Sequence, residues 1–299
     1  MRIALVTTSW PESRDAPSGH FVQAEARALE RAGHEVIVIA PPAGGAFGWP
    51  GVSSRLRDSP IRAVEAGLWV ASARRRLKHL PAVHRTIAHW AIPSAWPIGM
   101  STLGALDVVS HGGDVRLLLA LPHGIRCRIA SAIGRRACTW RFVSERLLSD
   151  LLRAVDADTR ALVGRIATVQ PSRLDMPDVG HRIDRLREHL GLRKVAVCAA
   201  RLVPSKHIER AIEHVAASRA FDGLVIVGDG PERANLERLA RSRQVDAHFI
   251  GVVDRSEALA WIGAAEALLH ASDAEGASTV VREARALGTP VVTLGADHT

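Results

Sequence analysis

The chain opens with a pattern of apolar and amphipathic stretches that predicts a strand, a helix and a second strand. Residues 2–8 (RIALVTT) form an apolar run typical of a buried strand. The amphipathic stretch at 21–33 predicts a helix that ends at Gly33, and the apolar run at 35–42 predicts a strand stopped by prolines. This order of elements predicts the start of a parallel, doubly wound sheet.

The remainder of the N-terminal half is less regular. Short strand-like runs recur at 106–110 and 138–144, with helical stretches between them. Residues 41–60 are rich in Gly, Pro and Ser, so we interpret them as a loop.

Residues 61–79 predict a helix with a basic end. Its apolar residues include Leu68, Trp69 and Val70, and its basic end runs from Arg74 to Lys78. Such a helix either lies on a membrane surface or packs on its own domain, and the sequence leaves both interpretations open.

The second half has the clearest pattern. Residues 170–194 are polar, with two prolines, and we interpret them as a linker. The five strands predicted beyond it lie at 194–200, 223–230, 247–253, 266–272 and 290–295, with helices between them at 207–218, 232–243, 256–265 and 279–287. We therefore predict an α/β protein with two Rossmann-like domains of doubly wound parallel sheet, residues 1–175 and 176–299.

Composition supports a globular protein. Of the 299 residues, 47% are hydrophobic and 23% are charged, which suffices for two well-cored domains. Three cysteines without metal-like spacing are typical of a reducing compartment. We find no pattern of a signal peptide or a transmembrane helix, and we expect a cytoplasmic protein.

The net charge is uneven along the chain. Residues 1–175 hold 23 basic and 14 acidic residues, which gives +9, whereas residues 176–299 hold 16 and 17, which gives −1. The basic half would attract membrane lipid headgroups, polyanionic sugars or nucleic acid. A solvated, arginine-rich surface explains the same charge equally well.

A candidate anion site follows the first strand of the second domain. Arg201 comes directly after that strand, and Lys206 opens the next predicted helix. A guanidinium and an ammonium at one turn suit a diphosphate. Surface Arg and Lys residues are common, so this pair by itself is weak support.

A second candidate lies at the last predicted helix, where Glu275 and Glu283 stand eight positions apart. We expect Thr279 to be the N-cap, and the backbone amides of Gly276, Ala277, Ser278 and Thr279 offer an anion site. The two carboxylates would accept hydrogen bonds from the hydroxyls of one extended ligand. A turn residue and a surface helix residue explain the pair equally well.

His111 begins the motif HGGD after the strand at 106–110. A histidine beside two glycines at a strand end would approach a substrate closely. Many such histidines are structural. The chain lacks HExxH, GxSxG and Walker motifs, and the absence of GxGxxG after the first strand argues against a dinucleotide oxidoreductase.

Taken together, these residues resemble the retaining glycosyltransferase family 4, which has the GT-B fold. SDAEGASTVVREARALGTPVV is similar to the family's E-x7-E segment, AARLVPSKHIERAI to its GRLVPEKG turn, and VGDGPERANLERLA to its GDGP segment. HWAIPSAW and SHGGD resemble two further family segments. The resemblance covers most of the chain.

The resemblance implies two Rossmann-like domains facing across a cleft, with a UDP- or GDP-hexose donor bound mainly by the second. Arg201 and Lys206 would hold the diphosphate, and Glu283 the ribose. Glu275 would contact the sugar hydroxyls, beside the amides already named, and His111 would stand over the transferred sugar. Gly19 would let the first loop approach the donor phosphates.

The resemblance also implies transfer with retained anomeric configuration, no metal and no other cofactor. The acceptor would be a glycan or a lipid-linked sugar in polysaccharide or glycolipid biosynthesis, reached through peripheral contact of the basic half with an anionic membrane. Family members usually continue beyond the strand at 290–295, so the resemblance implies a shortened C-terminal end. The family's paired glycines are replaced by Ser18-Gly19-His20, and its PNGVD segment by QPSRLD.

Two other functions remain open from the sequence. A catalytically weak sugar-nucleotide-binding or partner protein of the same fold would keep the same residues. Nucleic-acid binding finds little support, because helix-turn-helix, RNP and zinc motifs are missing.

Overall fold

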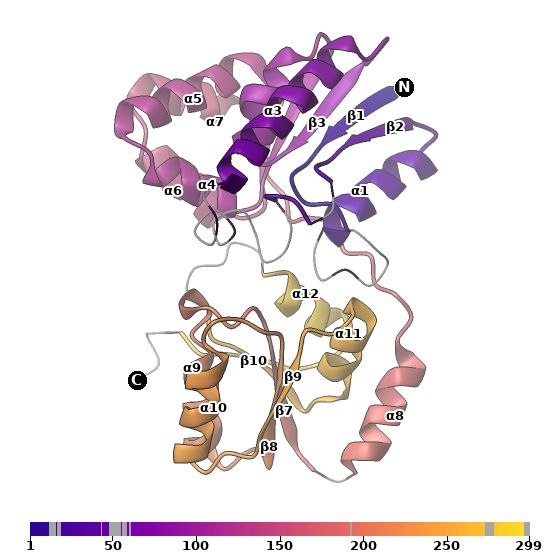
Figure 1. The fold of residues 1–299 in the computed structure, drawn as a ribbon, viewed down its shortest axis with the longest axis vertical. Helices are drawn as coiled ribbons and strands as arrows, with labels where there is room; N and C mark the ends of the chain where they lie inside the picture. Colours follow the sequence, from indigo (N-terminus) through magenta and orange to yellow (C-terminus); the bar gives the residue numbers. More distant parts are fainter. Residues whose placement is uncertain are drawn as a thin grey trace. The chain divides into compact units, whose positions relative to one another are not determined.

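A computed structural model describes residues 1–11, 16, 19–42, 44–47, 55, 59, 61–191, 193–272 and 278–295. The chain divides into two compact units (Figure 1). Unit 1 comprises Met1–Glu12 and Ser18–Asp175, and unit 2 comprises Ser13–Pro17 and Met176–Thr299. Each is an α/β unit built on one parallel sheet, as the sequence predicts.

The sheet of unit 1 has six parallel strands in the order β2-β1-β3-β4-β5-β6. The strands are β1 (Arg2–Val6), β2 (Glu35–Ile39), β3 (Arg85–His89), β4 (Ala105–Ser110), β5 (Thr139–Phe142) and β6 (Ala167–Val169). Their side chains are largely buried, which explains continuous apolar runs such as RIALV.

The described helices of unit 1 include α1 (His20–Arg31), α3 (Ile61–His79), α4 (Gly113–Ala120), α5 (His123–Arg136), α6 (Glu145–Arg153) and α7 (Ala157–Ile166). Between β3 and β4 lie an irregular, kinked segment, η1 (Ala91–Ile98), in which Ile92 and Trp96 take extended dihedrals, and a 3-10 turn, η2 (Gly99–Ser101). α3 confirms the helix expected at 61–79. Ala73 and Leu77 are buried and pack into the core beside β1, so the helix does pack on its own unit.

The sheet of unit 2 has five parallel strands in the order β11-β10-β7-β8-β9. They are β7 (Val195–Ala199), β8 (Gly223–Val227), β9 (Ala247–Gly251), β10 (Ala267–His270) and β11 (Val291–Thr293). The helices are α8 (Gly180–Leu190), α9 (Ile208–Ser218), α10 (Arg233–Ser242), α11 (Arg255–Ala264) and α12 (Thr279–Ala286), with a 3-10 turn, η3 (Pro204–Lys206), before α9. The predicted alternation of strands and helices is confirmed.

The structure corrects the interpretation of 170–194 as a linker. That stretch contains α8, and Val179 and Ile183 pack against the core formed by β7, β8 and α11. Arg187 also donates from Nη2 to the carbonyl of Gly263 at 2.8 Å. The apolar positions of α8 are too widely spaced among charges to stand out as a core-facing helix.

None of the described helices combines the length and the apolar character that crossing a bilayer requires.

Candidate functional site

The order of strands places the predicted site residues where parallel sheets bind ligands. Sequence order reverses between β1 and β3 in unit 1 and between β7 and β10 in unit 2. Ligands of open α/β sheets bind beyond the carboxyl ends of the strands at such a switch point. His111 follows β4, next to β3, while Arg201 follows β7 and Glu283 lies on the helix after β10.

Asp114 organises the loops at the carboxyl edge of unit 1. Its Oδ2 accepts from the backbone N–H of Ala91 at 2.8 Å, and its Oδ1 accepts from those of His111 and Gly112, both at 3.1 Å. The carboxylate is almost fully buried. The Asp of HGGD therefore fastens the start of η1 to the loop after β4 and fixes the backbone of His111.

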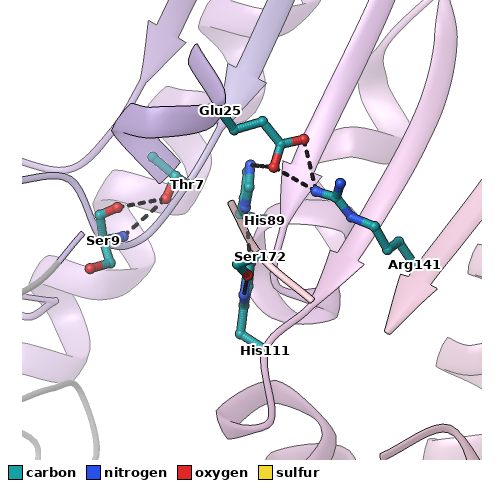
Figure 2. Close-up of polar contacts among 7 residues, drawn as sticks. All are labelled: Thr7, Ser9, Glu25, His89, His111, Arg141 and Ser172. Atoms are coloured by element: carbon teal, nitrogen blue, oxygen red, sulfur yellow. Dashed lines mark hydrogen bonds and ion pairs between the residues drawn. The ribbon is translucent and has the colours of Figure 1, made fainter. Parts of the chain in front are cut away.

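The imidazole of His111 lies in a polar and aromatic cluster (Figure 2). Its Nε2 lies 2.9 Å from Nδ1 of His89, and its Nδ1 lies 3.2 Å from Oγ of Ser172. The rings of His111 and His89 are nearly parallel, with centroids 5.1 Å apart, and meet edge to edge through these facing nitrogens. The ring centroids of Phe21 and Trp90 lie 4.6 and 4.8 Å from that of His111. His111 is half-buried, and both of its ring nitrogens have partners.

Behind His111 lies a buried ion pair. Arg141 Nη2 donates to Oε1 and Oε2 of Glu25 at 2.8 and 2.5 Å, and Glu25 Oε2 lies 3.8 Å from Nε2 of His89 (Figure 2). His89 is 0% exposed. Burial, and then the charge of Arg141, lower the pKa of His89 to about 3. Burial, His89 and Arg141 lower the pKa of His111 well below its usual value. Both rings are therefore neutral at physiological pH.

The end of β1 forms a compact turn. Thr7 is fully buried. Its Oγ1 donates to the carbonyl of Ser9 at 2.9 Å and accepts from the N–H of Ser9 at 3.2 Å (Figure 2). Gly19 caps α1 with φ of 89°, and a Cβ there would stand 2.7 Å from the nitrogen of Pro11. Packing within unit 1 thus already requires a glycine at position 19, and a role for Gly19 in donor binding stays a prediction.

In unit 2 the loop after β8 supports the loop that carries Arg201. A Cβ on Gly228 would lie 1.9 Å from the carbonyl oxygen of Ala200, so only glycine permits this approach. Leu202 N–H donates to the carbonyl of Asp229 at 3.0 Å. The GDGP segment therefore holds the backbone on both sides of Arg201.

Lys206 lies at the end of η3, and α9 begins at Ile208, so the expectation that Lys206 opens the helix is wrong. His207 interrupts the helix because it takes the left-handed conformation, with φ of 50°. The positive charge of Lys206 reaches the ends of two strands. Burial lowers the pKa of His270 on β10, and the charge of Lys206 lowers it further. Burial raises the pKa of Cys198 on β7 to about 12, and the charge of Lys206 opposes this rise.

The helix α12 differs from the expectation in two respects. Its N-cap is Ser278, not Thr279, and Ser278 Oγ is buried without a hydrogen-bond partner among the described residues. Glu283 is buried rather than on an exposed face, and Arg255 donates to its Oε1 from Nε and Nη2 at 3.3 and 2.8 Å. Burial raises the pKa of Glu283, and Arg255 opposes the rise.

The remaining donor-site residues expected from the sequence, Glu275, Gly276 and Ala277, lie outside the described residues. The structure therefore places Arg201, Lys206, Ser278, Thr279 and Glu283 at the carboxyl edge of one sheet, and His111 at the carboxyl edge of the other.

The structure also brings together a cluster that the sequence does not reveal. His123, Cys127 and Asp156 offer ligand atoms within 4.8 Å of one another, because the first two lie one turn apart on α5 and the third caps α7. However, Arg126 Nη2 lies 3.2 Å from His123 Nδ1, and Asp156 Oδ1 accepts from Thr159 N–H at 2.7 Å. The guanidinium and the capping bond oppose cation binding there.

Comparison with known proteins shows which family this chain is similar to. The family model "Glycosyl transferases group 1" matches residues 183–296, nearly the whole of unit 2. Individual relatives align with 97% and 98% of this chain, beyond the residues that the family model matches. These matches agree with the resemblance of the chain to this family of glycosyltransferases.

Two relatives show how far the likeness extends. A candidate teichuronic acid biosynthesis glycosyltransferase of Bacillus subtilis, TuaC, is 25% identical over 98% of this chain and 80% of the relative. A GDP-mannose-dependent α-(1-6)-phosphatidylinositol monomannoside mannosyltransferase of Mycobacterium tuberculosis is 28% identical over 97% of this chain and 80% of the relative. Both matches cover unit 1 as well as unit 2.

The fold is that of GT-B glycosyltransferases. Anabaena HepE in complex with UDP superimposes with a TM-score of 0.65 at 17% identity, over 98% of this chain and 80% of HepE. Sucrose-phosphate synthase from Thermosynechococcus elongatus superimposes with a TM-score of 0.67 at 17% identity, over 98% of this chain and 81% of the synthase. This confirms the predicted fold class.

Sequence reasoning missed four residues of these sites, namely Glu25, His89, Arg141 and Arg255. His89 carried a usable signal, because it ends an apolar run and opens the HWAIPSAW segment. Glu25 and Arg141 carried none, since they are 116 positions apart and meet only when α1 packs beside β5.

Proposed function

We propose that this glycosyltransferase moves a hexose from a nucleoside diphosphate sugar, with GDP-mannose as the first candidate donor, to a glycan or lipid-linked acceptor in glycolipid or polysaccharide biosynthesis. The observation that carries the proposal is the match of mannosyltransferases named as GDP-mannose-dependent over 97% and 98% of this chain. A UDP-hexose is the alternative donor.

The donor would bind at the carboxyl edge of unit 2. Arg201 and Lys206 would bind the diphosphate, because a planar guanidinium and an ammonium group can together donate hydrogen bonds to several phosphate oxygens. The N-terminus of α12 adds backbone N–H groups and the hydroxyl of Ser278, which has no hydrogen-bond partner among the described residues. Glu283 would accept from the ribose hydroxyls through Oε2, because the two Arg255 contacts given above use Oε1.

Catalysis would depend on charges that are already in place. Departure of the nucleoside diphosphate adds negative charge to the phosphate, and Arg201 and Lys206 would offset it without a metal ion. Glu275 and the neutral ring of His111 would hold hydroxyls of the transferred sugar. We propose that anomeric configuration is retained. Undiminished transfer in excess EDTA, and an α-linked product from an α-linked donor, are the results expected.

The acceptor would be reached at a membrane surface through α3. Ile61, Val64 and Leu68 are 73%, 62% and 67% exposed and follow one another at helical spacing, while the end of the helix carries the basic run 74–78. We expect the chain to sediment with vesicles containing anionic lipid at low salt and not with neutral vesicles. Leu68→Glu should abolish this binding, whereas the same change at exposed Leu117 on α4 should leave it unchanged.

Nucleotide binding tests the donor site directly. A nucleotide that binds only the folded state stabilises it by about 2.7 kcal/mol at 100 times its dissociation constant. We expect such a shift with GDP and GDP-mannose, a smaller one with UDP, and none in Arg201→Ala. A larger shift with UDP would reassign the donor. Binding without turnover would favour the alternative of a catalytically weak sugar-nucleotide-binding protein.

A further inference from the structure

The polar chain behind His111 determines which of its nitrogens carries a hydrogen. A neutral imidazole has one N–H and one lone pair, so only one of the facing nitrogens of His89 and His111 donates in their 2.9 Å contact. Settling the tautomer of His89 therefore settles that of His111.

The surroundings of His89 favour a hydrogen on its Nε2. This atom is buried without a hydrogen-bond partner among the described residues, and Glu25 Oε2 lies 3.8 Å from it. An N–H there points its positive end at the carboxylate, whereas a lone pair there would face a negatively charged oxygen. The Nδ1 of His89 then holds the lone pair and accepts from Nε2–H of His111.

We propose that His89 is a positioning residue that holds His111 as a neutral imidazole with its hydrogen on Nε2, so that Nδ1 of His111 accepts from a substrate hydroxyl. The hydroxyl of Ser172, 3.2 Å from that Nδ1, satisfies the acceptor in the free protein. This inference rests on the proposed role of His111 in holding the transferred sugar.

The charged groups around the two rings support a neutral His111. Glu25 on α1 and Arg141 on β5 form a pair without net charge behind His89. Asp114 on α4 is bound to three backbone N–H groups, and the uncharged rings of Phe21 and Trp90 lie beside His111. The charges of Glu25 and Arg141 cancel, and three backbone N–H groups stabilise the carboxylate of Asp114, which reduces its pull on an imidazolium.

The tautomers are observable without any assay of activity. The full chain labelled with 15N-histidine would be examined by long-range 1H–15N correlation from pH 5 to 8, with His89→Asn and His111→Asn for assignment. We expect His89 and His111 to be neutral throughout, each with its hydrogen on Nε2. A hydrogen on Nδ1 of either ring, or a charged His111 at pH 6, would overturn the proposal.

Two substitutions separate positioning from general stability. Asn at position 89 places an amide oxygen near the former Nδ1 and still accepts from His111, whereas His89→Leu does not. We expect His89→Asn to keep kcat/KM within about twofold, and His89→Leu to lose about tenfold, the usual effect of one hydrogen bond. In His89→Leu the loss should deepen at acidic pH, because the neighbouring His89 helps to lower the pKa of His111.

The outcomes remain distinguishable from failure of the proposed function. A wild-type chain without transfer activity would refute that function, while the nitrogen spectrum alone would still decide the tautomers. Equal losses in both variants, at all pH values and with an unchanged His111 spectrum, would show that His89 merely stabilises unit 1 and would overturn the inference.

Discussion

Acidification should destabilise unit 1 through His89. The pKa of His89 falls from 6.5 in an unfolded chain to about 3 in the folded unit, where the ring is 0% exposed. The unfolded chain therefore takes up a proton as the pH falls through 6.5, and the folded unit does not until about pH 3. Stability is complete above pH 6.5 and is lost progressively below it.

The magnitude follows from these two values. At pH 5 the unfolded histidine is almost fully protonated and lies 1.5 pH units below its pKa of 6.5, so the loss is about 2 kcal/mol. The folded value hardly matters for this figure, because any pKa below about 4 gives the same result. His111 adds a loss of the same sign, since its pKa is also lowered.

Urea unfolding at pH 7.5 and pH 5.0, followed by tryptophan fluorescence, measures the effect. Six of the seven tryptophans (Trp10, Trp49, Trp69, Trp90, Trp96 and Trp140) belong to the first 175 residues, so the signal reports mainly on unit 1. Between the two pH values, wild type should lose about 2 kcal/mol more than His89→Asn. The exposed His79 of α3 provides the control, His79→Asn, which should behave as wild type. Parallel losses in wild type and His89→Asn would refute the reasoning.

Three further predictions concern unit 2. Glu283→Ala leaves the largely buried Arg255 without this carboxylate, so it should lower the free energy of unfolding by about 3–5 kcal/mol, and Glu283→Gln should lower it less. Urea unfolding measures both, and a loss under about 1 kcal/mol in both variants would contradict this prediction. Gly228→Ala should abolish GDP binding in calorimetry, because its Cβ would stand 1.9 Å from the carbonyl oxygen of Ala200; unchanged binding would show that the loop adapts. Lys206→Met should weaken GDP binding about tenfold and reduce its salt dependence, and an equal effect of Lys194→Met would contradict a local role.

Much of the fold was accessible from the sequence because parallel strands leave a strong pattern. The strands of unit 2 are apolar runs bounded by glycine, proline and polar residues, and each appears where the pattern places it. β3 escaped prediction because only two of its five residues, RTIAH, are apolar, and its polar side chains find their hydrogen-bond partners far away in the sequence. Thr86 donates to Oγ1 of Thr102 at 2.7 Å, and His89 meets His111.

The site was predictable only as far as its residues are local. Arg201 and Lys206 belong to one turn, so their sequence already indicates an anion site. The burial of Glu283 depends on Arg255, which is 28 positions away, and no local pattern distinguishes it from an exposed helix glutamate. In the same way, the sequence places His111 at a strand end but does not show the burial, or the nearby His89 and Arg141, that lower its pKa.

Sugar transfer from a labelled donor is the most direct test of the central claim. Purified full chain would be incubated with GDP-[14C]mannose and with glycan and mannosylated inositol phospholipid acceptors, beside matched reactions with UDP-[14C]glucose. We predict transfer of label from GDP-mannose to an acceptor, unaffected by EDTA and lost in Lys206→Met and His111→Ala. A chain that binds both donors but transfers neither sugar to any acceptor would contradict the account.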